Sequence, residues 1–288
     1  MKRATAISWI TATLLAFTCG PGWAAGPEGM RLYVFSSGAL TGFAKAALQM
    51  GAQGTVEWAP VGFYVVKHPK GNVLFDTGNN DKTIADAEGW WGPLAKGFGL
   101  KMTQNDAIDV QLEKIGLKPS DIKWVVLGHM HLDHGGNMAK FPNATFVIQN
   151  DELKAAWWPD PGYTVYYIPG DFAESKKYNI VRLDANLDLF GDKSFEVIRS
   201  PGHTPGSQFA IVRLPKAGSV VLTSDACYLQ ESLDKNLIPP IPGTWSPMGM
   251  YEGYQKLRLI RDGEGARIFY AHDPEVYKAT KHAPEYYD

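Results

Sequence analysis

Cysteine is scarce in this sequence, with only Cys19 and Cys227 among its 288 residues. Cys19 lies near the N-terminus, in a segment that we expect the mature chain to lose. No internal disulfide is then possible. Cys227 is either a metal-binding thiolate or a small buried hydrophobic residue. We favour the second interpretation, because the sequence offers better metal ligands.

An excess of positive charge is also missing. The chain has 28 Lys and Arg residues against 30 Asp and Glu residues, and its formal net charge is −2. It contains no block of basic residues of the kind that attracts a phosphate backbone. The sequence therefore gives no support to a nucleic-acid partner, while its 45% hydrophobic residues are ample for a core.

A long apolar run of membrane-spanning length is the third absence. The run Ile7 to Thr18 is too short to cross a bilayer comfortably. It follows Lys2 and Arg3, and the small residues Gly22 and Ala24 stand at positions −3 and −1 of a cleavage after Ala24. This pattern is typical of a secretory signal peptide.

We therefore interpret residues 1–24 as a signal peptide and residues 25–288 as a single domain. The mature protein is expected to be exported, as a periplasmic or secreted protein without stable membrane association. A lipoprotein anchor on Cys19 is the alternative, but Phe17 and Thr18 fit that signal poorly.

One stretch of the mature chain is rich in metal-binding side chains. His129, His131, Asp133 and His134 fall within six residues, directly after the apolar run Trp124 to Leu127. If the strand continues, His129 and His131 point to the same side and can reach one ion. Asp133 and His134 lie beyond the strand and can turn toward a second ion. Packing alone explains such a cluster poorly.

Other predicted strands also end in a polar, metal-competent residue. These residues are Asp76, His129, His203, Asp225 and His272. Ligands at several strand ends converge on one edge of a sheet or sandwich, which predicts two facing sheets with helices outside. Asp76 has two open interpretations, a strand-end cap or a partner that orients a metal-binding histidine.

The remaining segments predict three helices and one long loop. Helices are expected over Thr103 to Ile115, Asp151 to Trp158 and Glu252 to Asp262. Ile84 to Lys101 is interpreted as a loop, in which Trp90 and Trp91 form either a satellite cluster or the wall of an apolar pocket. His68 and His282 have no motif around them and are taken as surface residues.

The number of candidate ligands indicates more than one ion. Five of the seven histidines lie in the motif or at strand ends. Asp133 and Asp225 bring the candidates to seven, whereas a single zinc ion takes three or four protein ligands. A seven-ligand set suits two ions that share a carboxylate.

The motifs together resemble the metallo-β-lactamase superfamily. They are His-x-His-x-Asp-His at 129–134, the turn Pro201-Gly202-His203-Thr204-Pro205-Gly206, the strand-end Asp225, the final His272 and Asp76-Thr77-Gly78. This resemblance implies an α/β fold, an αββα four-layer sandwich of two mixed sheets with helices on the outer faces. Within the superfamily, the sequence is most similar to the N-acyl-homoserine lactonases. The similar segments are Phe75 to Gly78, Lys101 to Thr103, Ser224 to Tyr228, Ala271 to Asp273 and Ala283 to Tyr287.

The resemblance also implies a role for each candidate residue. The first ion is expected on His129, His131 and His203, the second on Asp133, His134 and His272, and Asp225 bridges them. The implied cofactor is two Zn²⁺ per chain, with other divalent transition metals as alternatives.

The resemblance further implies how a lactone is opened. The metal-bridging hydroxide attacks the carbonyl of an N-acyl-homoserine lactone. Tyr228 is the implied substrate-contacting residue and Asp133 the implied proton relay.

Two other hydrolases remain alternatives on the same ligand set. One is a glyoxalase-II-like thioesterase, although only a short tail follows His272 where that family carries a helical, basic region. The other is an exported organophosphate or aryl-ester hydrolase, which a wide aromatic pocket would suit. In each case the partner is a small molecule, a lactone or another ester. The sequence leaves acyl-chain preference and oligomeric state open, a homodimer included.

Overall fold

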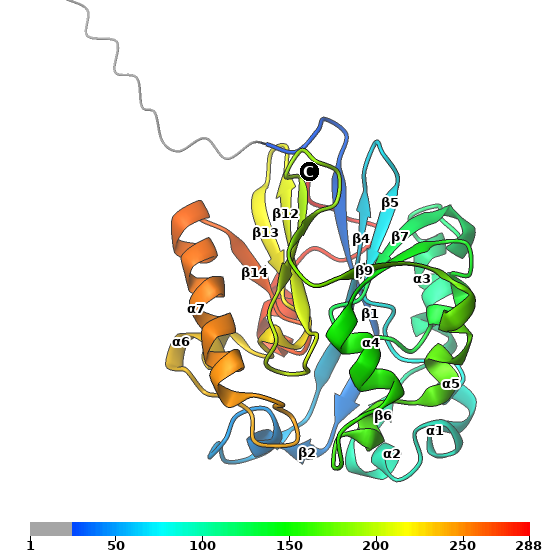
Figure 1. Cartoon of the computed structure of the whole chain (residues 1–288), viewed down its shortest axis with the longest axis vertical. Helices are drawn as coiled ribbons and strands as arrows, with labels where there is room; N and C mark the ends of the chain where they lie inside the picture. Colours follow the sequence, from blue (N-terminus) through cyan, green and yellow to red (C-terminus); the bar gives the residue numbers. More distant parts are fainter. Residues whose placement is uncertain (1–24) are drawn as a thin grey trace, which may run out of the picture.

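Two β-sheets pack face to face in the computed structural model, which describes residues 25–288 (Figure 1). The larger sheet has the strand order β6-β1-β4-β5-β7-β8-β9. Its strands are β1 (Arg31–Thr41), β4 (Ala59–Lys67), β5 (Asn72–Phe75), β6 (Gly99–Lys101), β7 (Ile122–Val126), β8 (Thr145–Gln149) and β9 (Asn179–Leu183). The sheet is mixed, because β5, β7, β8 and β9 run parallel while β1 pairs antiparallel with β4 and β6.

The smaller sheet has the order β10-β11-β12-β13-β14 and ends in one parallel pair, β13 with β14. Its strands are β10 (Leu187–Asp188), β11 (Phe195–Arg199), β12 (Gln208–Leu214), β13 (Gly218–Leu222) and β14 (Arg267–Phe269). A separate two-stranded ribbon joins β2 (Phe43–Ala44) to β3 (Thr55–Val56).

Helices cover the outer face of each sheet. The α-helices of residues 25–288 are α1 (Thr83–Trp91), α2 (Leu94–Gly97), α3 (Ile108–Glu113), α4 (Asn150–Trp157), α5 (Pro169–Phe172), α6 (Gln230–Lys235), α7 (Pro247–Glu264) and α8 (Pro274–Ala279). Side chains of α3, α4 and α5 pack in one core with the larger sheet, and those of α6 and α7 pack in another with the smaller sheet. The predicted αββα four-layer sandwich is confirmed.

The alternation of side chains along β1 explains how the layers adhere. Tyr33 and Phe35 face the helices on the outside, whereas Leu32 and Val34 face the smaller sheet. All four are buried. Successive residues of a strand point to opposite faces, so a strand covered on both sides reads as a continuous apolar run.

Three expectations from the sequence need correction. Ile84 to Lys101 is not a loop but contains α1, α2 and β6; α1 is kinked at Asp86, which has a non-helical backbone. The helix expected over Thr103 to Ile115 is broken, because a short 3₁₀ turn at Gln104–Asp106 precedes α3. His68 is buried, not exposed, and its ring stacks on Phe190 with 3.8 Å between centroids.

The predicted signal peptide and its cleavage after Ala24 lie outside the described residues. Within residues 25–288, none of the helices has both the length and the apolar character that crossing a membrane requires.

Candidate metal centre

The His129–His134 segment is a loop held in place by contacts at its backbone. Strand β7 ends at Val126, so it does not continue through His129 and His131, which was the condition for the two side chains to share a strand face. Instead, the Gly128 amide donates to Asp76 Oδ1 at 2.6 Å, and the Met130 amide donates to Glu152 Oε1 at 2.8 Å. These hydrogen bonds fix the loop, and hence the rings, without strand pairing.

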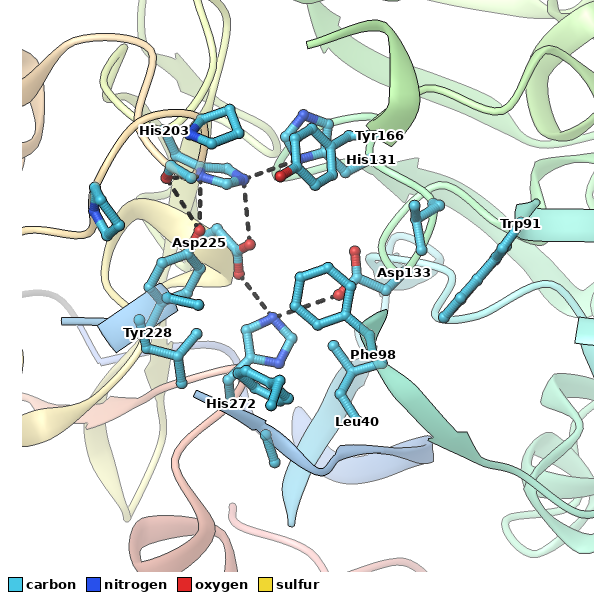
Figure 2. Close-up of a pocket in the computed structure, with 18 residues that line it drawn as sticks. Leu40, Trp91, Phe98, His131, Asp133, Tyr166, His203, Asp225, Tyr228 and His272 are labelled. Atoms are coloured by element: carbon cyan, nitrogen blue, oxygen red, sulfur yellow. Dashed lines mark hydrogen bonds and ion pairs between the residues drawn. The ribbon is translucent and has the colours of Figure 1, made fainter. Parts of the chain in front are cut away.

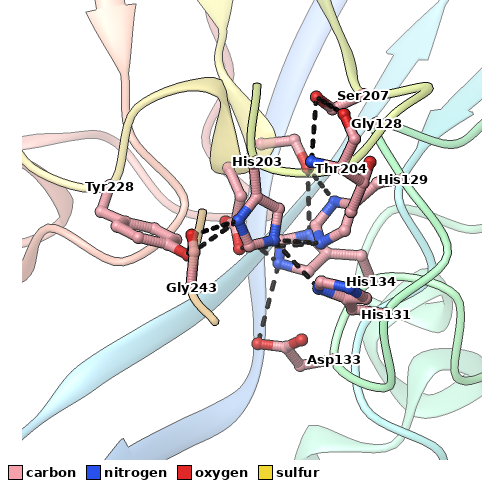
Figure 3. A network of polar contacts seen from close by, with 12 residues as sticks. Gly128, His129, His131, Asp133, His134, His203, Thr204, Ser207, Tyr228 and Gly243 are labelled. Carbon is pink, nitrogen blue, oxygen red and sulfur yellow. Dashed lines mark hydrogen bonds and ion pairs between the residues drawn. The ribbon is translucent and has the colours of Figure 1, made fainter. Parts of the chain in front are cut away.

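Three ring nitrogens converge in the first group of candidate ligands. His203 Nε2 lies 3.1 Å from His129 Nε2 and 2.9 Å from His131 Nδ1 (Figure 3). All three side chains are buried. The ligand atoms of these residues lie within 4.8 Å of one another, close enough to hold one ion.

The outer nitrogens of two of these rings have partners of their own. His203 Nδ1 lies 2.9 Å from the carbonyl oxygen of Gly243, to which it can only donate. His129 Nδ1 lies 3.2 Å from Ser224 Oγ. When Nδ1 carries the proton, Nε2 presents a lone pair to the centre. The lone pairs of neighbouring rings repel unless a cation or a proton lies between them.

Asp133, His134 and His272 form the second group. Asp133 Oδ2 lies 3.7 Å from His134 Nε2 and 3.6 Å from His272 Nε2. His134 Nδ1 contacts Asp76 Oδ2 at 2.9 Å, and His272 Nδ1 contacts the carbonyl oxygen of Pro60 at 2.9 Å. Both rings therefore direct Nε2 toward the centre. Of the two interpretations of Asp76, the structure supports that of a partner that orients a metal-binding histidine, here His134.

Asp225 lies between the two groups, with one carboxylate oxygen facing each (Figure 2). Its Oδ2 is 3.2 Å from His203 Nε2 and 3.6 Å from His129 Nε2. Its Oδ1 is 3.1 Å from His272 Nε2 and 3.2 Å from His134 Nε2. This two-sided geometry is what a carboxylate shared by two ions requires.

The electrostatics of the cluster are strongly perturbed. Burial, reinforced by neighbouring rings, holds the pKa of His129 and His131 well below the usual value. Burial also lowers the pKa of His134, but the carboxylates of Asp225, Asp133 and Asp76 together raise it well above that value. Despite its burial, Asp225 has a pKa well below its usual value because of the surrounding histidines. Opposed pKa shifts within one buried cluster are typical of functional sites.

The side chains fit divalent metal ions. Asp225 Oδ1, which faces the second group, is a buried atom without a hydrogen-bond partner. Buried polar atoms in proteins are almost always satisfied, so this oxygen indicates a ligand. Five imidazoles and two carboxylates form the nitrogen and oxygen donor set that zinc and similar ions prefer. Cys227 belongs to none of the clusters found in residues 25–288; it is buried, as the favoured interpretation expected.

An apolar pocket opens onto the candidate ligands. It has a volume of about 130 Å³, and His131, Asp133, His203, Asp225 and His272 line its polar end. Its remaining wall comes from β1, the ribbon and its connecting segment, the α1–β6 segment, the ligand loop, the segment after α4 and the loop before α7. It includes Leu40, Phe43, Leu48, Trp91, Phe98, Leu132, Tyr166, Pro240 and Pro242. Figure 2 shows Trp91, Phe98 and Leu40 on the same side of the site as Asp133. Trp91 is therefore pocket wall, one of the two roles considered for it.

Tyr228 lies at the same pocket. Its hydroxyl is 2.9 Å from His203 Nδ1 and 3.2 Å from the carbonyl oxygen of Gly243 (Figure 3). The residue is 5% exposed and lines the cavity. All eight candidate site residues thus gather in one place.

Two contributors were missed from the sequence. Tyr166 lines the pocket and its ring lies 5.2 Å from that of His131. Glu152 is buried behind the ligand loops and accepts the Met130 amide. Neither residue stands in a motif; for Glu152, the only sequence signal was a carboxylate on the apolar face of a short helix.

The comparisons with known proteins agree with this geometry. The model of the metallo-beta-lactamase superfamily matches residues 57–272. The N-acyl homoserine lactonase AttM of Azorhizobium caulinodans is 34% identical over 90% of this chain and 99% of its own length. The N-acyl homoserine lactonase of Bacillus cereus is 30% identical over 79% of this chain and 86% of its own length.

A solved structure has the same fold. It is an N-acyl homoserine lactone hydrolase with the product N-hexanoyl-L-homoserine bound at its catalytic metal centre. The TM-score is 0.79 at 23% identity, covering 92% of this chain and all of that one. Taken with the family match and the curated relatives, this chain belongs to the metallo-beta-lactamase superfamily and, within it, to the N-acyl homoserine lactonase family of metal-dependent hydrolases.

Proposed function

We propose that this protein hydrolyses the lactone ring of N-acyl-homoserine lactones with the help of two zinc ions. The observation that carries the proposal is Asp225, whose two oxygens face two separate groups of ligands inside an apolar pocket. Relatives at 34% and 30% identity are named N-acyl homoserine lactonases, which supports this substrate. The apolar wall suits an acyl chain, and the polar end suits a lactone carbonyl.

Seven residues would hold the ions, as the resemblance implies. His129, His131 and His203 would hold the first, Asp133, His134 and His272 the second, and Asp225 both. When bound, the two ions would supply Lewis acidity, which lowers the pKa of a water molecule and polarises a carbonyl group.

The side chains of the protein supply the remaining chemistry. Water adds to the lactone carbonyl carbon, the ring C–O bond breaks, and the leaving alkoxide takes up a proton to give an N-acyl-homoserine. Tyr228 can turn its hydroxyl from Gly243 toward the carbonyl oxygen and stabilise the charge that develops there. Asp133, which lines the pocket, accepts the proton of the attacking water and delivers it to the alkoxide.

A substrate panel tests the proposal. Protein loaded with Zn²⁺ is incubated with acyl-homoserine lactones of short and long chain, a thioester, an aryl ester and a phosphotriester, and acid release is measured. We expect the lactones to be opened fastest, with two zinc ions per chain by elemental analysis. Asp225→Ala should lose metal and activity together. Turnover of the thioester or phosphotriester without any lactone opening would reject the proposal in favour of the corresponding alternative.

We also propose that the mature protein is exported after cleavage behind Ala24. The basic start and short apolar run of residues 1–24 support this. Cell fractionation and N-terminal sequencing of the mature chain provide the test. A cytoplasmic protein that retains residues 1–24 would contradict export, and a lipid on Cys19 would favour the lipoprotein alternative.

A further inference from the structure

Glu152 connects segments of the chain that are far apart in sequence. It lies in α4, is fully buried, and its carboxylate accepts hydrogen bonds from four donors. The donors to Oε1 are the Met130 amide at 2.8 Å and the Tyr167 hydroxyl at 3.2 Å. The donors to Oε2 are the Thr204 hydroxyl at 2.5 Å and the Gly206 amide at 3.3 Å.

Two of these donors stand beside the histidines of the first ligand group. Met130 stands between His129 and His131, and Thr204 directly follows His203. One carboxylate thus joins the two loops that supply all three rings. The first group depends on the relation between these loops, because His203 comes from the turn after β11 and the other two rings from the loop after β7.

Packing tightens the same connection. A side chain at Gly206 would place its Cβ 2.1 Å from the amide nitrogen of Glu152, so the turn lies directly against α4. Tyr167, which donates to Glu152, also packs its ring edge-on to His131 with 4.8 Å between centroids. The Glu152 carboxylate therefore positions the His131 ring in two ways, through the neighbouring Met130 amide and through the ring of Tyr167.

The chemistry of a carboxylate suits this role. Ionised, it is an acceptor only, so both oxygens can receive two donors each. An amide of the same shape would turn an NH₂ group toward at least one of these donors. Burying the carboxylate is costly, since burial raises the pKa of Glu152 and the hydrogen bonds only partly offset this. Three of the four donors to this buried acid come from the two loops that carry the histidines, which packing alone does not explain.

We propose that Glu152 is a positioning residue that sets the spacing of the His129–His131 loop relative to the His203 turn, and thereby the affinity of the first metal site. The second site does not use this connection, because Asp76 and the Pro60 carbonyl orient its two histidines. The inference rests on the proposed two-ion centre but not on the lactone as substrate.

The direct test is Glu152→Gln, assayed by metal binding. We expect one of the two Zn²⁺ ions to bind about 10- to 100-fold more weakly, the usual cost of losing a hydrogen-bond partner behind a metal ligand. Competition with a chromophoric chelator measures this loss without reference to activity. Substitution with Co²⁺ should show an altered visible spectrum for one site only. The variant should lower kcat more than it raises KM.

A matched control separates positioning from general stability. Glu264 is also a buried carboxylate with several donors; it accepts from Arg213 at 2.8 Å and from Ser219 at 2.7 Å, and it contacts none of the candidate ligands. Glu264→Gln should lower the melting temperature while both ions bind as in the parent protein. A metal loss of the same size in Glu264→Gln would reduce the Glu152 effect to general destabilisation and overturn the proposal.

A second pair of variants covers the case in which Glu152→Gln does not fold. Thr204→Val removes one donor to Oε2, whereas Thr204→Ser keeps the hydroxyl. We expect weakened binding of one ion in Thr204→Val and rescue in Thr204→Ser. Unchanged affinity for both ions in Glu152→Gln, or in Thr204→Val if the former is insoluble, overturns the inference. Failure of the parent protein to bind two ions would instead reject the proposed centre.

Discussion

At the scale of single residues, the function of the site depends on which ring nitrogen of each histidine faces inward. Asp76 illustrates this most clearly. Its backbone has a φ of 60°, a conformation that costs energy outside glycine, and its two oxygens accept from Gly128 and contact His134. Strain held at a residue that orients a candidate ligand is consistent with a functional constraint.

Tyr228 gives a prediction at this scale. Tyr228→Phe should lower kcat about 100-fold, the order expected for losing one donor to a developing oxyanion, while both ions remain bound. Steady-state kinetics and elemental analysis of the same sample measure the two effects. Tyr254→Phe is a suitable control, because Tyr254 is also buried and also donates to a backbone carbonyl, that of Leu237, outside the pocket. Equal kcat in Tyr228→Phe and the parent protein would remove Tyr228 from the mechanism.

Most of the candidate site could be predicted from the sequence because its ligands stand in short motifs or at strand ends. His129 to His134 share one loop, and His203 follows a strand closely. Glu152 could not be found in this way. Its partners are backbone amides and hydroxyls that only the tertiary fold brings to it, and no local spacing records them.

At the scale of secondary structure elements, the segment α1 forms part of the pocket wall and is anchored at its end. The indole of Trp90 donates to Asp171 Oδ1 at 2.7 Å, and the side-chain NH₂ group of Asn80 donates to the same oxygen at 2.8 Å. The next residue, Trp91, lines the pocket. The segment was misinterpreted as a loop from the sequence because α1 is short and kinked at Asp86, so it lacks a helical apolar period.

Asp171 makes the stability of this anchor depend on pH. Burial raises its pKa to about 7, although the hydrogen bonds from Trp90 and Asn80 oppose the shift. The folded protein therefore binds a proton here more tightly than the unfolded chain does. Stability from this group is fully present below the unfolded pKa of 3.8 and is lost as pH rises toward 7.

Asp171→Asn should therefore be more stable than the parent protein at pH 8, by about 5 °C in melting temperature, and the difference should shrink as the pH falls from about 7 toward the unfolded pKa of 3.8. Asparagine keeps the oxygen that accepts from Trp90 and puts an NH₂ group where Oδ2 now lacks a partner. Thermal unfolding of both proteins across pH 4 to 8 measures the difference. A difference in melting temperature that does not change with pH would show that Asp171 does not titrate with a raised pKa.

At the scale of the whole molecule, the candidate centre joins the two sheets. His129, His131, Asp133 and His134 follow β7 of the larger sheet, whereas His203, Asp225 and His272 follow β11, β13 and β14 of the smaller sheet. The four-layer fold was predictable from its family motifs and strand pattern. The position of one sheet relative to the other was not predictable, because it depends on side-chain packing between strands that are distant in sequence.

Metal removal should accordingly lower the stability of the whole fold. Ions that bind only the folded state stabilise it by about 3 kcal/mol at a concentration 100 times the dissociation constant. We expect chelator-treated protein to melt several degrees lower than the loaded protein, and Zn²⁺ to restore the difference. Calorimetry with and without the ion provides the measurement. Identical melting temperatures, with metal shown to be absent and then present, would contradict a centre that links the sheets.

The division of the ligands between two sheets has a consequence for how this enzyme can change. A substitution in the core between the sheets, for instance at Val212 in the middle of β12, alters how closely the sheets approach without changing a ligand. It also alters the distance between the four ligands of one sheet and the three of the other. Substitutions of apolar residues outside the pocket can therefore change metal preference and turnover. Mutant libraries that vary only the pocket wall do not sample these substitutions.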